Sequence, residues 1–86
     1  MIGTVAAVSR RRAMVAVLTD EGDYSLMEMI FDDPPDLGDR VEWHADTPLG
    51  RADVVNLSSP LRRTLHVFFQ NHHSSARAVR TNSLMR

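Results

Sequence analysis

The fold is decided by residues 13–31, AMVAVLTDEGDYSLMEMIF, in which two apolar runs flank the polar turn Asp20-Glu21-Gly22-Asp23. Apolar runs separated by a short loop that contains Gly are typical of a β-hairpin. The stretch predicts strands over residues 13–19 and 23–31. Gly22 should adopt a positive φ in the turn, because it has no Cβ to clash there.

Side chains alternate between the two faces of a strand, which divides the second strand of this hairpin into two sets. Tyr24 and Leu26 share one face, and we expect this face to form the core. Ser25, Met27 and Met29 share the other face.

The rest of the chain reads as further short strands separated by turn signals. Two prolines and four aspartates in residues 32–39 mark the clearest break, because Pro cannot occupy a central strand. Enrichment in β-branched residues or polar–apolar alternation predicts strands over residues 2–9, 40–45, 51–57 and 64–70. Ser74 or Ser75 could cap a short helix reaching about residue 84, or this tail could fray.

Composition sets broad limits on the class of protein. The chain of 86 residues has room for one domain, and its 43% of hydrophobic residues is normal for a folded protein. Cys is absent, which excludes disulfides and thiolate metal sites and is compatible with a reducing cytoplasm, where we expect the protein to act. The amino terminus lacks the pattern of a signal peptide, and no apolar run is long enough to span a membrane.

Charge is unevenly distributed along the chain, and every cationic side chain except those of the histidines is Arg. Residues 1–12 contain three Arg and no acid. Residues 13–50 contain ten acids and one Arg, and residues 51–86 contain six Arg and one acid. Both ends of the chain are therefore basic and its middle is acidic, although the net charge is only −1.

Five short strands with a tight second hairpin and a long connection after it favour an all-β, five-stranded OB-type Greek-key barrel. We expect this barrel to occupy residues 1–58. Residues 59–86 would be a C-terminal extension, containing a sixth strand and a short helix or tail.

Three segments resemble the bacterial cold-shock domain over about residues 3–57. Residues 3–5, GTV, are similar to its opening motif. Residues 37–43, LGDRVEW, are similar to its fourth strand, and residues 50–54, GRADV, to its fifth. The resemblance implies a small barrel that binds single-stranded RNA or DNA.

The aromatic nucleic-acid-binding motifs of that family are missing from this chain. In an alignment without gaps, residues 12–16 and 24–28 replace the family's two ring-rich runs. The family's rings fall on Met14, Ala16, Ser25, Met27 and Glu28, and Ala7 takes the place of an exposed Trp. This alignment predicts that Met14, Ala16, Ser25 and Met27 share one outward sheet surface without stacking rings. Base stacking contributes about 1–3 kcal/mol per base, so cold-shock-like binding by this surface is disfavoured.

Two hypotheses of different classes remain for a non-catalytic binding module. The first is weak electrostatic binding of single-stranded nucleic acid through Arg clusters. Its site residues are Arg10, Arg11, Arg12, Arg62 and Arg63. The other interpretation of these arginines, which the absence of interleaved aromatic residues favours, is a solvated turn and a solvated tail.

The second hypothesis is a protein-binding or self-associating module. Phe68 and Phe69 must face opposite sides of a strand, so one of them needs cover from the tail or from a second subunit. A soft docking face of thioether side chains would complete the interface. Its site residues are Met14, Met27, Met29, Phe68 and Phe69.

Metal binding and catalysis are disfavoured, and we expect neither a cofactor nor an enzyme. His72 and His73 are adjacent, so on an extended chain they point apart and do not ligate one ion together. Asp32 and Asp33 lie in a loop that we expect to be open to solvent, which does not suit a catalytic pair of carboxylates. No Gly-rich phosphate loop or nucleophile motif is present in the sequence.

Overall fold

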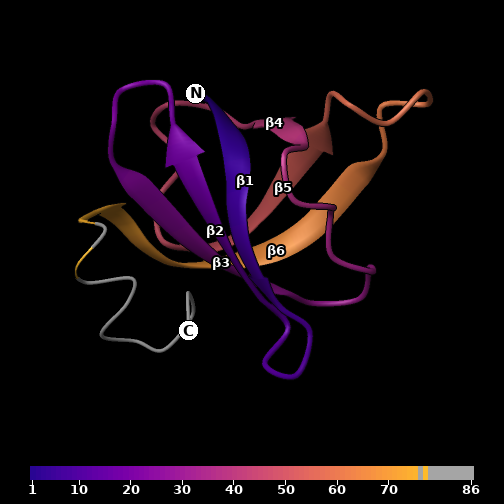
Figure 1. Cartoon of the computed structure of the whole chain (residues 1–86), viewed down its shortest axis with the longest axis horizontal. Helices are drawn as coiled ribbons and strands as arrows, with labels where there is room; N and C mark the ends of the chain where they lie inside the picture. Colours follow the sequence, from indigo (N-terminus) through magenta and orange to yellow (C-terminus); the bar gives the residue numbers. More distant parts are fainter. Residues whose placement is uncertain (76, 78–86) are drawn as a thin grey trace.

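The computed structural model, which describes residues 1–75 and 77, is an all-β barrel closed by six antiparallel strands (Figure 1). The wall follows the order β1-β2-β3-β6-β5-β4, and β4 pairs with β1 to close it. The strands are β1 (Ile2–Ser9), β2 (Met14–Thr19), β3 (Tyr24–Met29), β4 (Arg40–Glu42), β5 (Gly50–Asn56) and β6 (Thr64–Ser74). No helix in the described part of the chain is long and apolar enough to cross a membrane.

The predicted hairpin is confirmed as β2 and β3. Gly22 has a φ of 95° in the turn, a value that costs a residue without a side chain little. The Thr19 amide donates to the Asp23 carbonyl at 2.8 Å, and the Gly22 amide donates to the Thr19 carbonyl at 2.9 Å. The Thr19 hydroxyl donates to the Asp23 carboxylate at 2.6 Å, so side chains also close the turn.

The sixth strand differs most from its predicted place. It is a member of the barrel wall, lying between β3 and β5 and hydrogen-bonded to both, and it runs four residues beyond the predicted end. The wall therefore has six strands, whereas five were expected. Of the predicted terminal helix, Ser74 belongs to β6, and residues 76 and 78–84 lie outside the described residues.

Aliphatic, thioether and aromatic side chains from all six strands fill the barrel. Phe69 and Met27 are the largest fully buried side chains, and the Trp43 and Phe69 ring centroids lie 5.2 Å apart. The buried cluster consists of Val5, Val15, Val17, Met27, Met29, Val41, Trp43, Val54, Leu65, Val67 and Phe69.

The prediction that Tyr24 and Leu26 face the barrel core is wrong. In the β2–β3 register Val15 pairs with Met27, and Val17 pairs with Ser25. Paired residues share one face of the sheet, so Ser25 and Met27 lie on the inner face with the two valines. Leu26 is buried in a separate cluster on the outer face of the wall, against which Tyr24 packs.

The same register corrects the predicted surface of Met14, Ala16, Ser25 and Met27. Met14 and Ala16 lie on the outer face, whereas Ser25 and Met27 are buried on the inner face. The gap-free alignment of the third strand therefore misassigns its faces, and the case against base stacking cannot rest on it. Whether bases can stack there depends on which side chains the outer surface carries.

Gly3 lies where β1 and β2 approach each other too closely for a side chain. A Cβ at this position would meet Val17 Cγ1 at 2.5 Å and the Leu18 carbonyl oxygen at 2.7 Å. The Leu18 carbonyl oxygen is a backbone atom fixed in the sheet, so it cannot move away as the end of a flexible side chain can. The wall therefore needs glycine here for space.

We predict that Gly3→Ala lowers the free energy of unfolding by about 1–3 kcal/mol, because the added methyl group forces the two strands apart. Urea unfolding followed by circular dichroism would measure the loss. The comparison is Gly22→Asn, which adds backbone strain at positive φ without a clash, since a Cβ at Gly22 meets nothing within 4 Å. Equal stability of Gly3→Ala and wild type would contradict the close approach.

Candidate functional site

The outer surface of β6 carries the exposed rings that the outer surface of β1 to β3 lacks. Side chains along β6 alternate strictly from Thr64 to Gln70, with Leu65, Val67 and Phe69 buried. His66 and Phe68 therefore point outward together. The expectation that one of the two adjacent phenylalanines enters the core is confirmed, since Phe69 is fully buried and Phe68 is 40% exposed.

A third ring, which the sequence did not single out, joins this surface. Phe31 follows β3 and is 81% exposed, and its ring meets His66 edge-on with centroids 6.3 Å apart. We call Phe31, His66 and Phe68 the aromatic strip. Phe31 could have been identified from its place between the apolar end of β3 and the charged Asp32, where few buried positions remain.

Charged groups of both signs border the aromatic strip, with Arg51 beside Phe68 and two carboxylates beside His66. Asp32 accepts the His66 amide at 2.8 Å and lies 3.1 Å from His66 Nδ1. The hydrogen bond from the His66 backbone amide is the main reason that the pKa of Asp32 lies below its usual range. Asp53 lies on the other side, with its Oδ1 atom 3.9 Å from His66 Nε2.

The two predicted Arg clusters do not form one site. Arg10, Arg11 and Arg12 lie in the connection between β1 and β2, and Arg62 and Arg63 lie in the connection between β5 and β6. Figure 1 shows these two connections at opposite ends of the barrel.

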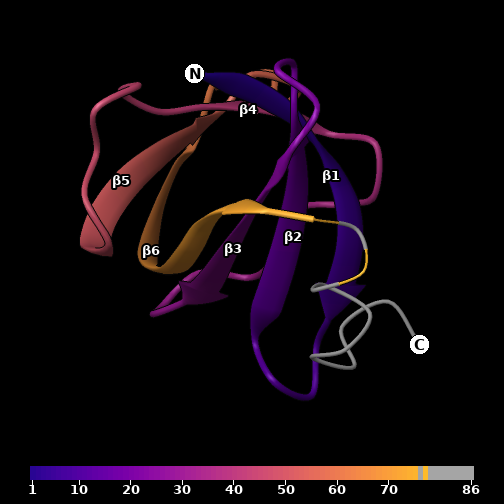
Figure 2. The same cartoon turned by 90° about the vertical axis from the view of Figure 1, so that its left-hand side faces the viewer.

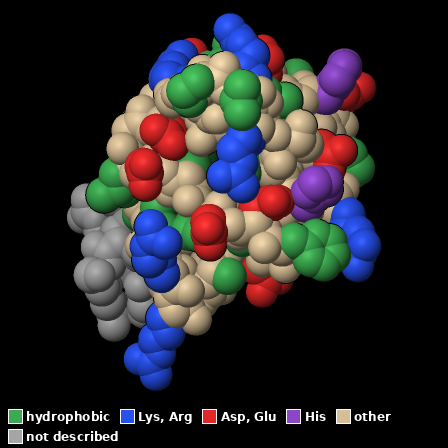
Figure 3. Space-filling view, turned by 90° about the vertical axis from the view of Figure 1, so that its right-hand side faces the viewer, with side chains coloured by type: hydrophobic (Ala, Val, Ile, Leu, Met, Phe, Trp, Pro, Cys, Tyr) green, Lys and Arg blue, Asp and Glu red, His purple; other side chains and the backbone are tan. Residues whose placement is uncertain are grey.

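Carboxylates accompany the basic groups at both ends. Arg10 shares a shallow hollow with Asp36, and Arg63 shares another with Asp33, Asp36 and Asp39. On the face shown in Figure 3, acidic and basic side chains are interspersed, with hydrophobic groups between them. Phosphate attracted by either cluster would also meet the acidic 32–39 connection.

The outer face of β1, β2 and β3, seen in Figure 2, offers few groups for recognition. Ala7, Ala16 and Leu26 are buried there, with Met14 and Tyr24 packed against them. Tyr24 is the one aromatic side chain of these three strands. This face therefore cannot supply the several stacking platforms of a cold-shock-like surface.

The predicted protein interface is only partly at the surface. Met27, Met29 and Phe69 are buried in the barrel core, so their assignment to a docking face is wrong. Met14 is half-buried on the outer face. Phe68 is the member of the predicted set that the structure places on the aromatic strip.

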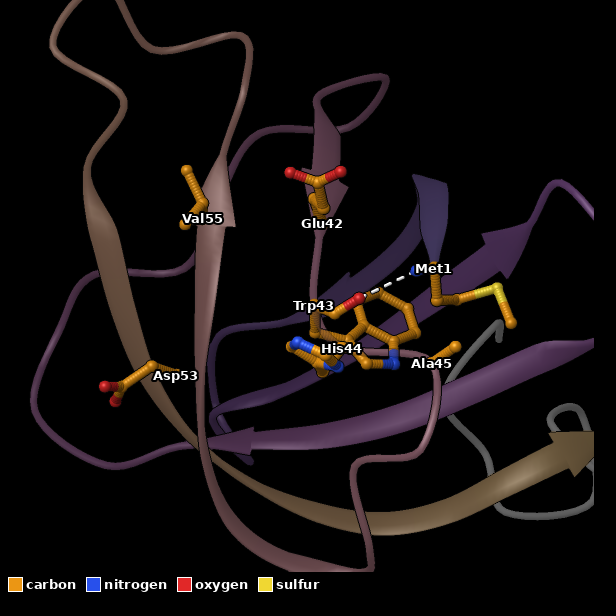
Figure 4. A pocket seen from close by; sticks show the side chains of 7 residues that line it. All are labelled: Met1, Glu42, Trp43, His44, Ala45, Asp53 and Val55. Atoms are coloured by element: carbon orange, nitrogen blue, oxygen red, sulfur yellow. Dashed lines mark hydrogen bonds between the residues drawn. The ribbon is translucent and has the colours of Figure 1, made fainter.

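An open hollow of about 590 Å³ adjoins the aromatic strip through Asp53. Figure 4 shows its lining, which comes from the amino terminus, β4, the segment after it, and β5. The Met1 amine donates to the Trp43 carbonyl at 2.7 Å. The Glu42 and Asp53 carboxylates lie apart in this view, so they do not converge on a common point as a pair of catalytic acids would.

The two adjacent histidines near the end of β6 have different environments. His72 shares a hydrogen bond of 2.9 Å with the Ser25 hydroxyl, and its ring lies 4.6 Å from Phe69. His73 Nδ1 donates to Asp23 at 2.6 Å. Within residues 1–75 and 77, no group of three or more potential ligands could hold a metal ion.

These environments shift the two histidines in opposite directions. Burial, which penalises the charged ring, lowers the pKa of His72. The hydrogen bond to Asp23, with the charge of that carboxylate, raises the pKa of His73. His72 therefore contributes stability that is lost as pH falls below the unfolded value of 6.5, and His73 contributes stability that is lost as pH rises above it.

We predict that His72→Gln flattens the acid side of the stability–pH curve and that His73→Gln flattens the side above pH 6.5. Thermal melts between pH 5 and 8 would measure both effects. His44→Gln is the control, because the His44 side chain is 90% exposed. The assignment of the two histidines is wrong if their substitutions change the same side of the curve.

In comparisons with protein-family models, curated proteins and solved structures, no match to this chain was found. The candidate site therefore stands on the geometry of the chain itself.

Proposed function

We propose that this chain is a non-catalytic protein-binding module that uses the aromatic strip as its contact surface. The observation that carries the proposal is the exposure of Phe31 and Phe68 on one surface, while every ring of the barrel core is buried. Exposed large aromatic side chains are enriched at protein interfaces, where they supply most of the binding energy.

The charges around the strip favour a protein over a nucleic acid. Asp32 and Asp53 flank His66. Phe68 pairs with Glu28 on one side and with Arg51 on the other, so these neighbours bring three carboxylates and one guanidinium to the strip. Carboxylates beside exposed rings repel phosphate, so bases stacked on these rings would bring their backbone into an unfavourable field. A protein partner can meet the same carboxylates with amide or cationic groups.

The architecture that presents the strip is, in our proposal, a variant of the OB-type Greek key of which the cold-shock domain is one form. The order β4-β1-β2-β3, with a long connection over residues 30–39 returning β4 to the side of β1, fits the Greek-key pattern. In this variant β6 enters the wall between β3 and β5. The recognition surface moves with it, from the first three strands to the last.

We predict that a benzoyl-phenylalanine photo-crosslinker at Phe68 forms a nuclease-resistant adduct with protein, because the side chain lies at a protein contact. The experiment is done in the source cells, and the adduct is identified by mass spectrometry. The control places the crosslinker at Leu61, which is 88% exposed and lies outside the aromatic strip. Nuclease-sensitive adducts, or equal protein adducts at both positions, would contradict the proposal.

The nucleic-acid hypothesis has its own test in backbone amide spectra recorded with a mixed-sequence single-stranded oligonucleotide. We predict no shifts at Arg10, Arg11 or Arg12 at physiological ionic strength, because the acidic 32–39 connection offsets their charge. Electrostatic phosphate binding would give shifts at low salt that vanish steeply as salt is raised. Shifts that persist at physiological salt would favour nucleic acid over protein as the ligand.

A further inference from the structure

The inference concerns one row of side chains across three strands of the outer surface. Phe68 on β6 pairs with Glu28 on β3 and with Arg51 on β5. Paired residues of adjacent antiparallel strands point to the same face, so all three side chains are directed outward. All three are exposed. The row therefore consists of an acidic side chain, an aromatic ring and a basic side chain, in that order.

No ion pair joins Glu28 and Arg51 across the Phe68 ring. Two strand spacings separate them, about 10 Å. Within residues 1–75 and 77, neither forms an ion pair. The row consequently presents two opposite charges, one on each side of a half-exposed phenyl ring.

Such a row is complementary to a second copy of itself. When two convex barrel walls meet along β6 about a two-fold axis parallel to that strand, the β3 side of one copy faces the β5 side of the other. This places Glu28 of each copy opposite Arg51 of its partner, with the two Phe68 rings between the ion pairs. A two-fold interface requires this kind of self-complementarity.

The alternative orientation is disfavoured by the same charges. A two-fold axis perpendicular to β6 would place Glu28 on Glu28 and Arg51 on Arg51. Like charges brought together in this way cost several kcal/mol in an interface. The row therefore selects one of the two face-to-face arrangements.

The next row along β6 contains Asp53, His66 and the bound Asp32. In the selected orientation Asp53 of one copy would approach Asp32 of the other. The Asp32 side chain is only 20% exposed and already accepts the amide and ring nitrogens of His66. The twist of packed sheets also rotates one β6 against the other by about 30°, which separates the rows that lie away from the point where the two strands cross. The Phe68 row therefore dominates the contact.

We propose that the partner of the aromatic strip is a second copy of this chain, joined by Phe68–Phe68 packing and two reciprocal Glu28–Arg51 ion pairs. This inference rests on the proposed function. A stable dimer buries about 800 Å² per copy, which is about 15% of the 5257 Å² surface of this chain.

Sedimentation equilibrium over a concentration series at low ionic strength tests the dimer with charge-reversal variants. Glu28→Arg and Arg51→Glu should each raise the dimer dissociation constant about 10-fold or more, because each creates two like-charge contacts. The double variant Glu28→Arg/Arg51→Glu should restore it to within about 3-fold of wild type, since the pairs re-form with exchanged signs.

Three controls keep the result specific. Glu21→Arg, a charge reversal in the exposed β2–β3 turn, should leave the dissociation constant unchanged, and Phe68→Ser should abolish association. Thermal melts establish that each variant is folded. A wild-type chain that stays monomeric up to its solubility limit, or a double variant that fails to recover, overturns the inference.

The dimer and the proposed function fail in different ways. A monomeric wild type whose Phe68 crosslink yields a different protein removes the dimer and leaves the protein-binding function standing. Crosslinks between two copies of the chain at Phe68, together with recovery by the double charge reversal, support both. Absence of any protein adduct at Phe68 removes the proposed function and the dimer with it.

Discussion

The alternation of side chains along β6 is the constraint on which the rest of the structure depends. Its inward residues Leu65, Val67 and Phe69 complete a core to which all six strands contribute, and its hydrogen bonds join β3 to β5. The same alternation directs His66 and Phe68 to the surface. Because Phe68 and Phe69 are adjacent, a barrel closed by β6 buries one of them and exposes the other.

The sequence predicts the strands of the barrel better than it predicts which way they face. The hairpin, its positive-φ Gly22 and the bounds of β1 follow from local residue patterns. The faces of β3 do not, because Tyr24, Leu26, Met27 and Met29 place apolar groups on both sides. Only the register with Val15 and Val17 decides between those sides, and a register is a contact between strands.

The candidate site was predicted in part for similar reasons. Phe68 could be identified because two adjacent phenylalanines cannot both be inside one strand. The Glu28–Phe68–Arg51 row could not, because it depends on which strands lie beside β6. Local patterns gave no sign that β6 would separate β3 from β5. The Arg clusters illustrate the reverse case, since they look alike in sequence and lie at opposite ends of the barrel.

The barrel wall has its fewest ladder pairs at β4. This strand has three residues and pairs with β1 at three positions and with β5 at two. Arg40 reinforces it from outside, donating to Asp20 at 2.8 and 2.9 Å and to Thr4 at 2.9 Å. Segments with few backbone hydrogen bonds open at a lower free energy than the rest of a fold. On heating, β4 would therefore separate from β1 and β5 before the β2–β3 hairpin opens. The edges of β1 and β5 would then be unpaired, and strands could be exchanged between molecules there.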